Sequence, residues 1–374
     1  MKAAVDEVGL FYRTTEPSAA SHLALRWKGR MRYAVPLDAR AQRACWQLFQ
    51  PGRLELPLRV TARLPRVFGV VSCVESEKLA LIREAIGREA GVSSCRAGTP
   101  GPWTKDTILL LDHAAKPLLI VKAGKGEAVD RLLRNEAEWL RSLRNKPQLA
   151  GHVPEMVAHQ SGTELSFVAQ SLLPGRPCFK LGEPHINFLK KFQEASRRSL
   201  RYEESKLYRN LQLRMKDLDG HLTGDWARRI EKAMRRIQDQ FSGAPILMTA
   251  AHNDFAPWNI RIEGGVARIF DWEYADEEQL PLFDLLHFAL MPMALKREAP
   301  AKIIRKMRET LRFCEPWLGK ESCAKSETQA LAYLVNLCTL FLWPVNGKYD
   351  KAPALDTYAL VIDRLCGRQE EMHA

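Results

Sequence analysis

Short apolar runs bounded by turn-forming or charged residues occur mainly in the first half of the chain and predict β-strands. They lie at residues 23–27, 31–35, 93–97, 107–111, 117–121, 154–157 and 166–169. Elsewhere, apolar residues recur three or four positions apart, a spacing typical of helices. These stretches lie at residues 76–88, 129–143, 188–196, 206–218, 226–241, 301–313, 327–343 and 354–365. The pattern predicts an α+β protein with a strand-rich first part and a mainly helical second part.

A strand–turn–strand pattern interrupts the helical second part. A β-rich run at 260–262 is followed by a Gly-Gly turn and by a second β-rich run at 266–270. This order predicts a short hairpin. The hairpin would bring Asp271 back beside the loop that holds Asp254 and Asn259, so that two carboxylates and an amide converge at the edge of a small sheet.

Carboxylate and amide oxygens in this arrangement suit phosphoryl transfer. Mg²⁺ prefers hard oxygen ligands and takes few of them from the protein, so Asp271 and the side-chain oxygen of Asn259 are the expected metal ligands. Asp254 would orient an attacking hydroxyl group and accept its proton, a division of labour that protein kinases use. Taken alone, Asp254 would more simply be a satisfied acid in a turn, but the ordered set favours the functional interpretation.

Two motifs in this region resemble those of a known family. They are His-Asn-Asp-Phe-Ala-Pro-Trp-Asn at 252–259 and Asp-Trp-Glu at 271–273. Together they resemble the aminoglycoside phosphotransferase and choline kinase-like family of small-molecule kinases. The resemblance implies a protein-kinase-like bilobal fold with a small antiparallel-sheet N-lobe and a mainly helical C-lobe. We therefore expect a basic N-terminal extension, a nucleotide-binding N-lobe and a C-lobe with the catalytic loop, at residues 1–70, 71–171 and 172–374.

Lys122 and Glu136 are predicted to form an ion pair. Lys122 ends a strongly apolar strand, where a charged group needs a partner or a ligand. Glu136 lies on the apolar stripe of the helix at 129–143 and should also be paired. Glu138 lies off this stripe and is expected to be solvated. Kinases use such a pair to hold the α- and β-phosphates, and the resemblance implies the same role here.

Two further segments complete the expected nucleotide site. Gly98 and Gly101 lie in a turn whose small residues would let backbone N–H groups approach phosphates. The turn lacks a full Gly-x-Gly-x-x-Gly motif and contains two prolines, which have no N–H donor, so a plain hairpin turn is an equal alternative. The resemblance implies a hinge between the lobes, where Ala169, Gln170 and Leu172 meet the adenine.

Several neighbours of the loop have expected roles. His252 should brace the loop through hydrogen bonds rather than transfer a proton, and Phe255 and Trp258 should lie in the core. The resemblance implies that Asp284, at the start of the next helix, buttresses the loop. It also associates acids near residues 276–278 with cationic substrates, although three acids in a basic protein do not establish this.

The formal net charge of +12 is unevenly distributed, because residues 1–70 contain twelve Lys and Arg against five Asp and Glu. Such an excess indicates either a solvated basic surface or an anionic partner, such as a nucleotide, a sugar phosphate or a lipid head group. Nucleic acid is the least favoured partner, since no nucleic-acid motif is present. Weak contact of the N-terminal region with an anionic membrane surface, through the basic stretch at 53–66, is the alternative to packing on its own domain.

The remaining composition indicates a cytoplasmic protein with reduced thiols. Its eight cysteines lack Cys-x-x-Cys pairs, which argues against a zinc site and a disulfide framework. No signal peptide is evident. No apolar run is expected to span a bilayer, because the nearest candidate, 330–345, is short and contains Asn336 and Thr339.

The expected function is a Mg²⁺-dependent kinase that transfers phosphate from ATP, or alternatively GTP, to a hydroxyl of a small molecule. Choline-like, aminoglycoside, sugar and amino-acid acceptors are all open, and the positive charge slightly favours a sugar or an anionic glycan intermediate. One alternative is a pseudokinase or scaffold that binds nucleotide or an anionic partner, in keeping with the incomplete Gly turn. Another is a membrane-surface or polysaccharide-assembly factor that uses the basic N-terminal region.

Overall fold

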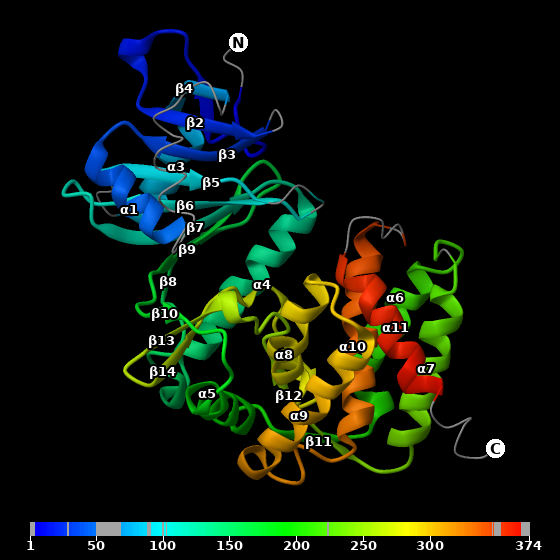
Figure 1. The fold of residues 1–374 in the computed structure, drawn as a ribbon. Coiled ribbons are helices and arrows are strands. Elements are labelled where there is room, and N and C mark those ends of the chain that lie inside the picture. The colour runs from blue at the N-terminus through cyan, green and yellow to red at the C-terminus, as the bar shows by residue number, and fades with distance from the viewer. Residues whose placement is uncertain are drawn as a thin grey trace. The chain divides into compact units, whose positions relative to one another are not determined.

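The computed structural model describes residues 4–27, 30–49, 69–87, 91–98, 101, 103–222, 224–345, 347 and 353–367. The chain divides into two compact units, Met1–Ser142 with Pro154–Leu172 and Leu143–Val153 with Leu173–Ala374 (Figure 1). The first unit contains one large sheet, and the second is mainly helical. The predicted α+β organisation is therefore confirmed, whereas the three-part division at residues 70 and 171 stays a prediction.

A nine-stranded sheet forms the centre of the first unit, in the order β1-β4-β2-β3-β5-β6-β7-β9-β8. Its strands are β1 (Phe11–Arg13), β2 (His22–Trp27), β3 (Arg30–Pro36), β4 (Gly69–Glu75), β5 (Val92–Arg96), β6 (Lys105–Leu111), β7 (Pro117–Gly124), β8 (Met156–Gln160) and β9 (Ser166–Ser171). Every neighbouring pair is antiparallel. All seven strands predicted from apolar runs in this part of the chain are present.

The N-terminal region belongs to this sheet. In the pairing of β3 with β5, Tyr33 lies opposite Arg96 and Ala34 lies opposite Cys95. β4 begins at Gly69 and pairs with both β1 and β2, so the sheet continues without a break across residue 70. The sheet is consequently larger than the small one expected for an N-lobe.

Helices cover both faces of the sheet. The helices that begin in this unit are α1 (Ala39–Phe49), α3 (Glu77–Ile86) and α4 (Glu127–Arg144). Along β6, Ile108 and Leu110 pack in the same core as α3, whereas Leu109 and Leu111 pack in the core of α1. This alternation follows from the pleat of a strand, which points successive side chains to opposite faces.

The first turn of α1 is capped by Asp38. Its Oδ1 accepts the backbone N–H groups of Arg40 at 3.0 Å and Ala41 at 2.8 Å, two donors that otherwise have no partner within the helix. The basic stretch at 53–66 lies outside the described residues, as do Thr99, Pro100 and Pro102 of the turn predicted to approach phosphates.

The second unit combines helices with two small sheets. Its helices are α5 (Glu183–Glu194), α6 (Lys206–Asp217), α7 (Trp226–Phe241), α8 (Phe283–Leu295), α9 (Pro300–Leu318), α10 (Ser326–Leu342) and α11 (Pro353–Gly367). One sheet contains β10 (Arg176–Pro177), β13 (Ile260–Glu263) and β14 (Val266–Ile269), and the other contains β11 (Arg198–Leu200), β12 (Ile246–Ala251) and β15 (Asp276–Gln279). The predicted hairpin is confirmed as β13–β14, with Gly264 and Gly265 both at positive φ in its turn.

Helix α10 corrects the expectation that no segment is long and apolar enough to cross a membrane. By length and composition, Ser326–Val345 meets that criterion over 20 residues. However, 67% of its apolar window is buried inside the protein. Its polar residues are also satisfied there, since Arg214 Nη1 donates to Asn336 Oδ1 at 2.9 Å and to Thr339 Oγ1 at 3.3 Å. These are the contacts of a core helix.

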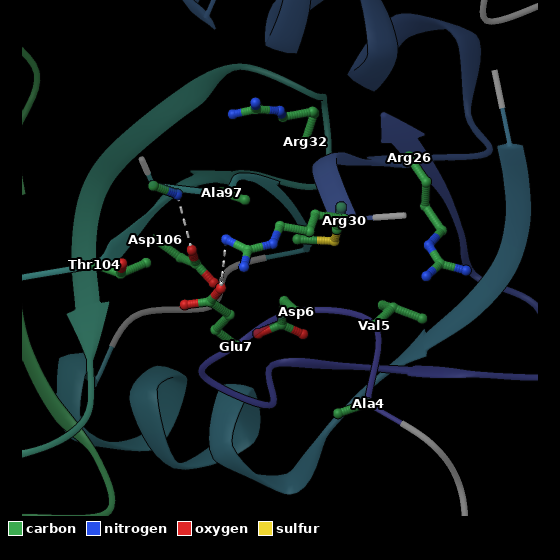
Figure 2. A pocket seen from close by; sticks show the side chains of 12 residues that line it. Ala4, Val5, Asp6, Glu7, Arg26, Arg30, Arg32, Ala97, Thr104 and Asp106 are labelled. Atoms are coloured by element: carbon green, nitrogen blue, oxygen red, sulfur yellow. Dashed lines mark hydrogen bonds and ion pairs between the residues drawn. The ribbon is translucent and has the colours of Figure 1, made fainter. Parts of the chain in front are cut away.

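A pocket of about 220 Å³ in the first unit is lined by three acidic side chains and three arginines (Figure 2). Asp6 accepts three backbone N–H groups of the turn that follows it, and Glu7 lies 3.5 Å from Arg30. Asp106 is buried and accepts the N–H of Gly98 at 3.0 Å through Oδ1, while its Oδ2 has no hydrogen-bond partner among the described residues. Burial and the nearby Asp6 carboxylate raise the pKa of Asp106 to about 7.

Replacing Asp106 by Asn should therefore stabilise the protein at about pH 8 and change little at about pH 5. Folded Asp106 holds its proton up to about pH 7, whereas an unfolded Asp releases it near pH 4. The folded state binds more protons between these values, so the free energy of unfolding falls as pH rises through them. Asn keeps the acceptor for Gly98 without the charge. We expect a gain on the order of 1–3 kcal/mol above pH 7, measured by denaturant unfolding.

Glu84→Gln is the matched control for this measurement. Glu84 is an exposed acid on α3 in the same unit, so its substitution should shift stability by a similar small amount at every pH. A difference between Asp106→Asn and wild type that is constant from about pH 5 to 8 would contradict the assignment.

Candidate functional site

The loop after β12 is held by a buried carboxylate on α8. Asp284 accepts the backbone N–H of His252 at 2.8 Å through Oδ2 and that of Asn253 at 2.9 Å through Oδ1. Burial raises the pKa of Asp284 to about 6, and the two loop amides oppose this rise by stabilising the charge. Asn253 adopts a left-handed conformation with φ of 61° and donates from Nδ2 to the carbonyl of Tyr274 at 2.9 Å. Asp284 thus contacts the loop as the resemblance implied.

His252 braces the same loop from within. Its Nδ1 accepts the N–H of Asp254 at 3.2 Å, so the proton lies on Nε2, which donates to the carbonyl of Phe270 at 3.1 Å. Burial lowers the pKa of His252 to about 4, so the ring is neutral at physiological pH. The predicted bracing by hydrogen bonds is confirmed. Phe255 is buried as expected, but Trp258 is 38% exposed, so its predicted place in the core is wrong.

Asp254 and Asn259 are linked directly by the turn between them. The amide nitrogen of Asn259 donates to the Oδ2 of Asp254 at 2.8 Å and to its carbonyl at 3.0 Å. Both partners are acceptors, which fixes the orientation of the amide and leaves Oδ1 of Asn259 as its remaining acceptor. Pro257 begins the short 3₁₀ turn η4 (Pro257–Asn259) and sets this geometry. The Asp254 side chain remains 25% exposed.

The hairpin returns Asp271 to the same place, as its register requires. Ile260 lies opposite Ile269, and Phe270 donates its N–H to the carbonyl of Asn259 at 3.2 Å. Asp271 follows directly, with φ of 75° in the left-handed region that non-glycine residues rarely adopt. The fold therefore brings Asp254, Asn259 and Asp271 together, while their chemical roles stay predictions.

The predicted ion pair of Lys122 and Glu136 is present in the first unit. Lys122 Nζ lies 2.6 Å from Oε1 and 2.8 Å from Oε2 of Glu136, and both residues are buried. β7 continues to Gly124, so Lys122 lies inside the strand rather than at its end. Removing one partner of such a buried ion pair strongly destabilises the folded protein, because the other charge is left uncompensated.

Two amides of the predicted phosphate turn, those of Gly98 and Gly101, donate to acceptors of the chain itself. Gly98 donates to Asp106, and Gly101 donates to Thr104 Oγ1 at 2.8 Å. A Cβ added at Gly98 would lie 2.1 Å from the carbonyl oxygen of Lys105. Close approach of the two strands is therefore sufficient reason for glycine at this position, and the phosphate-binding role of Gly98 and Gly101 stays a prediction.

The predicted adenine-binding residues lie at the end of β9. Ala169 and Gln170 pair with β7 on one side and with β8 on the other, so their backbones belong to the sheet. Leu172 is the first residue beyond the strand and the last of the first unit. The side-chain oxygen of Gln170 is buried without a hydrogen-bond partner among the described residues. The role of these three residues toward adenine stays a prediction.

The acids at 276–278 are paired within the second unit. Asp276 lies 3.4 Å from Lys206 Nζ, and Glu278 lies 3.1 Å from Arg198 Nη1 and accepts the backbone N–H of Lys206 at 2.7 Å. Glu277 also lies within 3.8 Å of Arg198. Arg198 and Lys206 thus already pair with the acidic side chains that a cationic ligand would need.

Two residues of the site were not found by sequence reasoning. His287 Nε2 lies 3.1 Å from Asp254 Oδ1, and Tyr333 on α10 contacts the other ring nitrogen of His287 at 3.3 Å. A signal for His287 was present, since it is a polar residue inside the apolar run 285–290 and a buried polar group needs a partner. No local pattern connects Tyr333 with the loop, because it lies on a separate helix.

Comparisons with known proteins identify the family and the fold of the chain. The sequence matches the phosphotransferase enzyme family over residues 100–316, more than half of the chain. A thermostable mutant of aminoglycoside phosphotransferase APH(4)-Ia, solved with ADP and hygromycin B, has a TM-score of 0.50 at 12% identity, covering 77% of this chain and 97% of its own. Another, solved with AMP-PNP and hygromycin B, has a TM-score of 0.50 at 13% identity over the same shares of both chains.

A third solved structure, the ternary complex of APH(2")-IIa with streptomycin and ATP, gives a TM-score of 0.48 at 16% identity and covers 79% of this chain and 98% of that one. The search of curated proteins found no match. The chain has the protein-kinase-like, bilobal α+β fold that its motifs indicated. Because the family match spans residues 100–316 and includes both motifs, the chain belongs to the phosphotransferase enzyme family.

Proposed function

We propose that this protein transfers the γ-phosphate of ATP, with Mg²⁺, to a hydroxyl group of a small molecule. The observation that carries the proposal is the orientation of Asn259. Its amide nitrogen is held on Asp254 by two hydrogen bonds, which leaves its oxygen as a ligand atom, and its backbone carbonyl accepts the N–H of Phe270, the residue before Asp271. The same contact holds a carboxylate where a proton acceptor is needed.

Asn259 and Asp271 fit a magnesium ion by their chemistry. Each offers a hard oxygen, and the hairpin register keeps them adjacent. The left-handed backbone of Asp271 is a further feature typical of functional positions, where strained conformations concentrate. When bound, the ion would neutralise charge on the phosphates.

Lys122 and Glu136 would bind the nucleotide. The Glu136 carboxylate holds the Lys122 ammonium group in one position, from which it would contact the α- and β-phosphates. ADP and AMP-PNP are bound in structurally similar aminoglycoside phosphotransferases and support a nucleotide of this class, and GTP is its alternative. Asp254 would orient the acceptor hydroxyl and take its proton, with most of the rate enhancement coming from positioning and charge neutralisation.

A neutral or anionic acceptor, such as a sugar or a glycan intermediate, is proposed in preference to a polycation. The acids at 276–278 support this preference because Arg198 and Lys206 already pair with them. A cytoplasmic location is part of the proposal, since all eight cysteines are free thiols. Contact of residues 1–70 with an anionic membrane surface stays a prediction.

One observation favours a second candidate, a pseudokinase that binds nucleotide without transferring phosphate. The amides of Gly98 and Gly101 already donate hydrogen bonds to Asp106 and Thr104, and this would weaken the binding of a phosphate. The two candidates differ in turnover, which the next experiment measures.

Asp254→Ala should abolish turnover while nucleotide binding remains. Loss of a general base typically lowers the rate by about 10²- to 10⁴-fold, whereas the expected nucleotide contacts lie on other residues. Turnover is measured as ADP release from MgATP with a panel of hydroxyl acceptors and with water.

Glu277→Gln is the control, because Glu277 is an exposed acid of the same unit, and it should retain activity. Full activity of Asp254→Ala would remove Asp254 from the proposed role, and an inactive wild type that binds nucleotide would favour the pseudokinase.

Asp271→Asn should remove the metal-dependent part of nucleotide binding. ATP with Mg²⁺ should stabilise the wild type by about 2.7 kcal/mol at a hundredfold excess over its Kd, seen as a higher Tm. The variant should show no gain from Mg²⁺, because an amide oxygen lacks the charge of the carboxylate. Asp225→Asn, at an exposed acid paired with Arg228, should behave as wild type. An equal Mg²⁺ effect in all three proteins would exclude Asp271 as a ligand.

A further inference from the structure

His287 is a buried polar residue in an apolar helix. α8 is apolar on all sides near this position, and only 2% of His287 is exposed. A buried imidazole is retained without cost to stability only when its ring nitrogens have partners. Both nitrogens of His287 have one, and one of these partners is the carboxylate that we assign as the proton acceptor.

The partners determine which ring nitrogen carries the proton. An ionised carboxylate only accepts hydrogen bonds, so the contact of 3.1 Å with Asp254 Oδ1 requires a proton on Nε2. In a neutral ring Nδ1 is then an acceptor, and the hydroxyl of Tyr333 at 3.3 Å is its donor. This is one consistent chain of donors from Tyr333 through His287 to Asp254.

Tyr333 is itself fixed by packing. It is buried, and its ring lies edge-on to Phe283 with centroids 5.8 Å apart and to Tyr358 at 6.5 Å. Burial raises the pKa of Tyr333 well above its ordinary value, so the hydroxyl keeps its proton throughout the physiological range. The hydroxyl of Tyr333 therefore keeps the proton that donation to His287 Nδ1 requires, and Tyr358 is the other side chain with which it hydrogen-bonds.

Both oxygens of the Asp254 carboxylate consequently accept a hydrogen bond. Oδ1 accepts from His287 on α8, and Oδ2 accepts from Asn259 on η4. We infer that His287 is a positioning residue that holds Asp254 in its reactive orientation, and that Tyr333 sets the tautomer that this requires. The inference rests on the proposed role of Asp254 as proton acceptor.

The contact of His287 with Asp254 predicts a specific kinetic effect. Without His287 the carboxylate loses one donor and part of its orientation, so His287→Ala should lower kcat by roughly 10- to 100-fold and leave the KM for ATP unchanged. His287→Gln, whose amide can donate at the same place, should recover part of kcat.

The kinetic test uses hydrolysis of MgATP with water as acceptor, which needs no identified substrate. His185→Gln is the control, because His185 is an equally buried histidine that packs on Phe288 and accepts the N–H of Gly182, away from Asp254. It should leave kcat and the KM for ATP unchanged. If His287→Ala and His287→Gln both match the control while Asp254→Ala is inactive, the inference is overturned and the proposed function stands. Activity in Asp254→Ala would overturn both.

A second measurement is independent of activity and of the folding of any Ala variant. Long-range ¹⁵N–¹H spectra of the histidine side chains report the tautomer of each ring, and His287→Gln assigns the signal. We expect His287 of the wild type to be protonated on Nε2 alone, and Tyr333→Phe to convert it to a mixture of tautomers. A wild-type signal from the Nδ1-protonated tautomer would overturn the proposed chain of donors.

Discussion

The candidate site depends on one buried carboxylate, that of Asp284, and on the two backbone N–H groups that it accepts. Burial disfavours its charge and raises its pKa to about 6, so the ionised form persists at neutral pH through the amides of His252 and Asn253. These hydrogen bonds in turn fix the backbone immediately before Asp254. The position of Asp254, the proposed proton acceptor, thus depends on the hydrogen bonds that stabilise a different acid. That acid, Asp284, lies on the core helix α8 rather than on the loop.

The polar groups around Asp254 are oriented in the same way, because each acceptor receives a hydrogen bond from a donor on another element. Asn259 donates to Asp254 from the turn η4, His287 donates to it from α8, and Tyr333 donates to His287 from α10. Such a network is rigid only when every member is satisfied. The same requirement explains why polar residues are retained in α8 and α10, two helices whose remaining side chains are largely apolar.

Local spacing was sufficient to predict the parts of this site that lie close in sequence or share a regular element. The hairpin that returns Asp271, and the pairing of Lys122 with Glu136, follow from a Gly-Gly turn and from a carboxylate on an apolar stripe. Trp258 was placed wrongly because apolar character does not reveal which way a side chain points from an irregular turn. Tyr333 and the joining of β3 to β5 depend on contacts between distant segments, which no local period encodes.

The incomplete Gly turn has a physical explanation once the enlarged sheet is considered. Gly98 must be glycine because the carbonyl of Lys105 lies where a side chain would begin, and its amide is held by Asp106. Asp106 lies in the same pocket as Asp6, which closes the N-terminal turn. The turn borders the same pocket as the N-terminal region, which adds β1 to β3 to the sheet. A packing constraint at Gly98 therefore accounts for part of the departure from the glycine pattern of kinases. This departure is weak evidence for lost phosphate binding, because the ion pair of Lys122 and Glu136 is present.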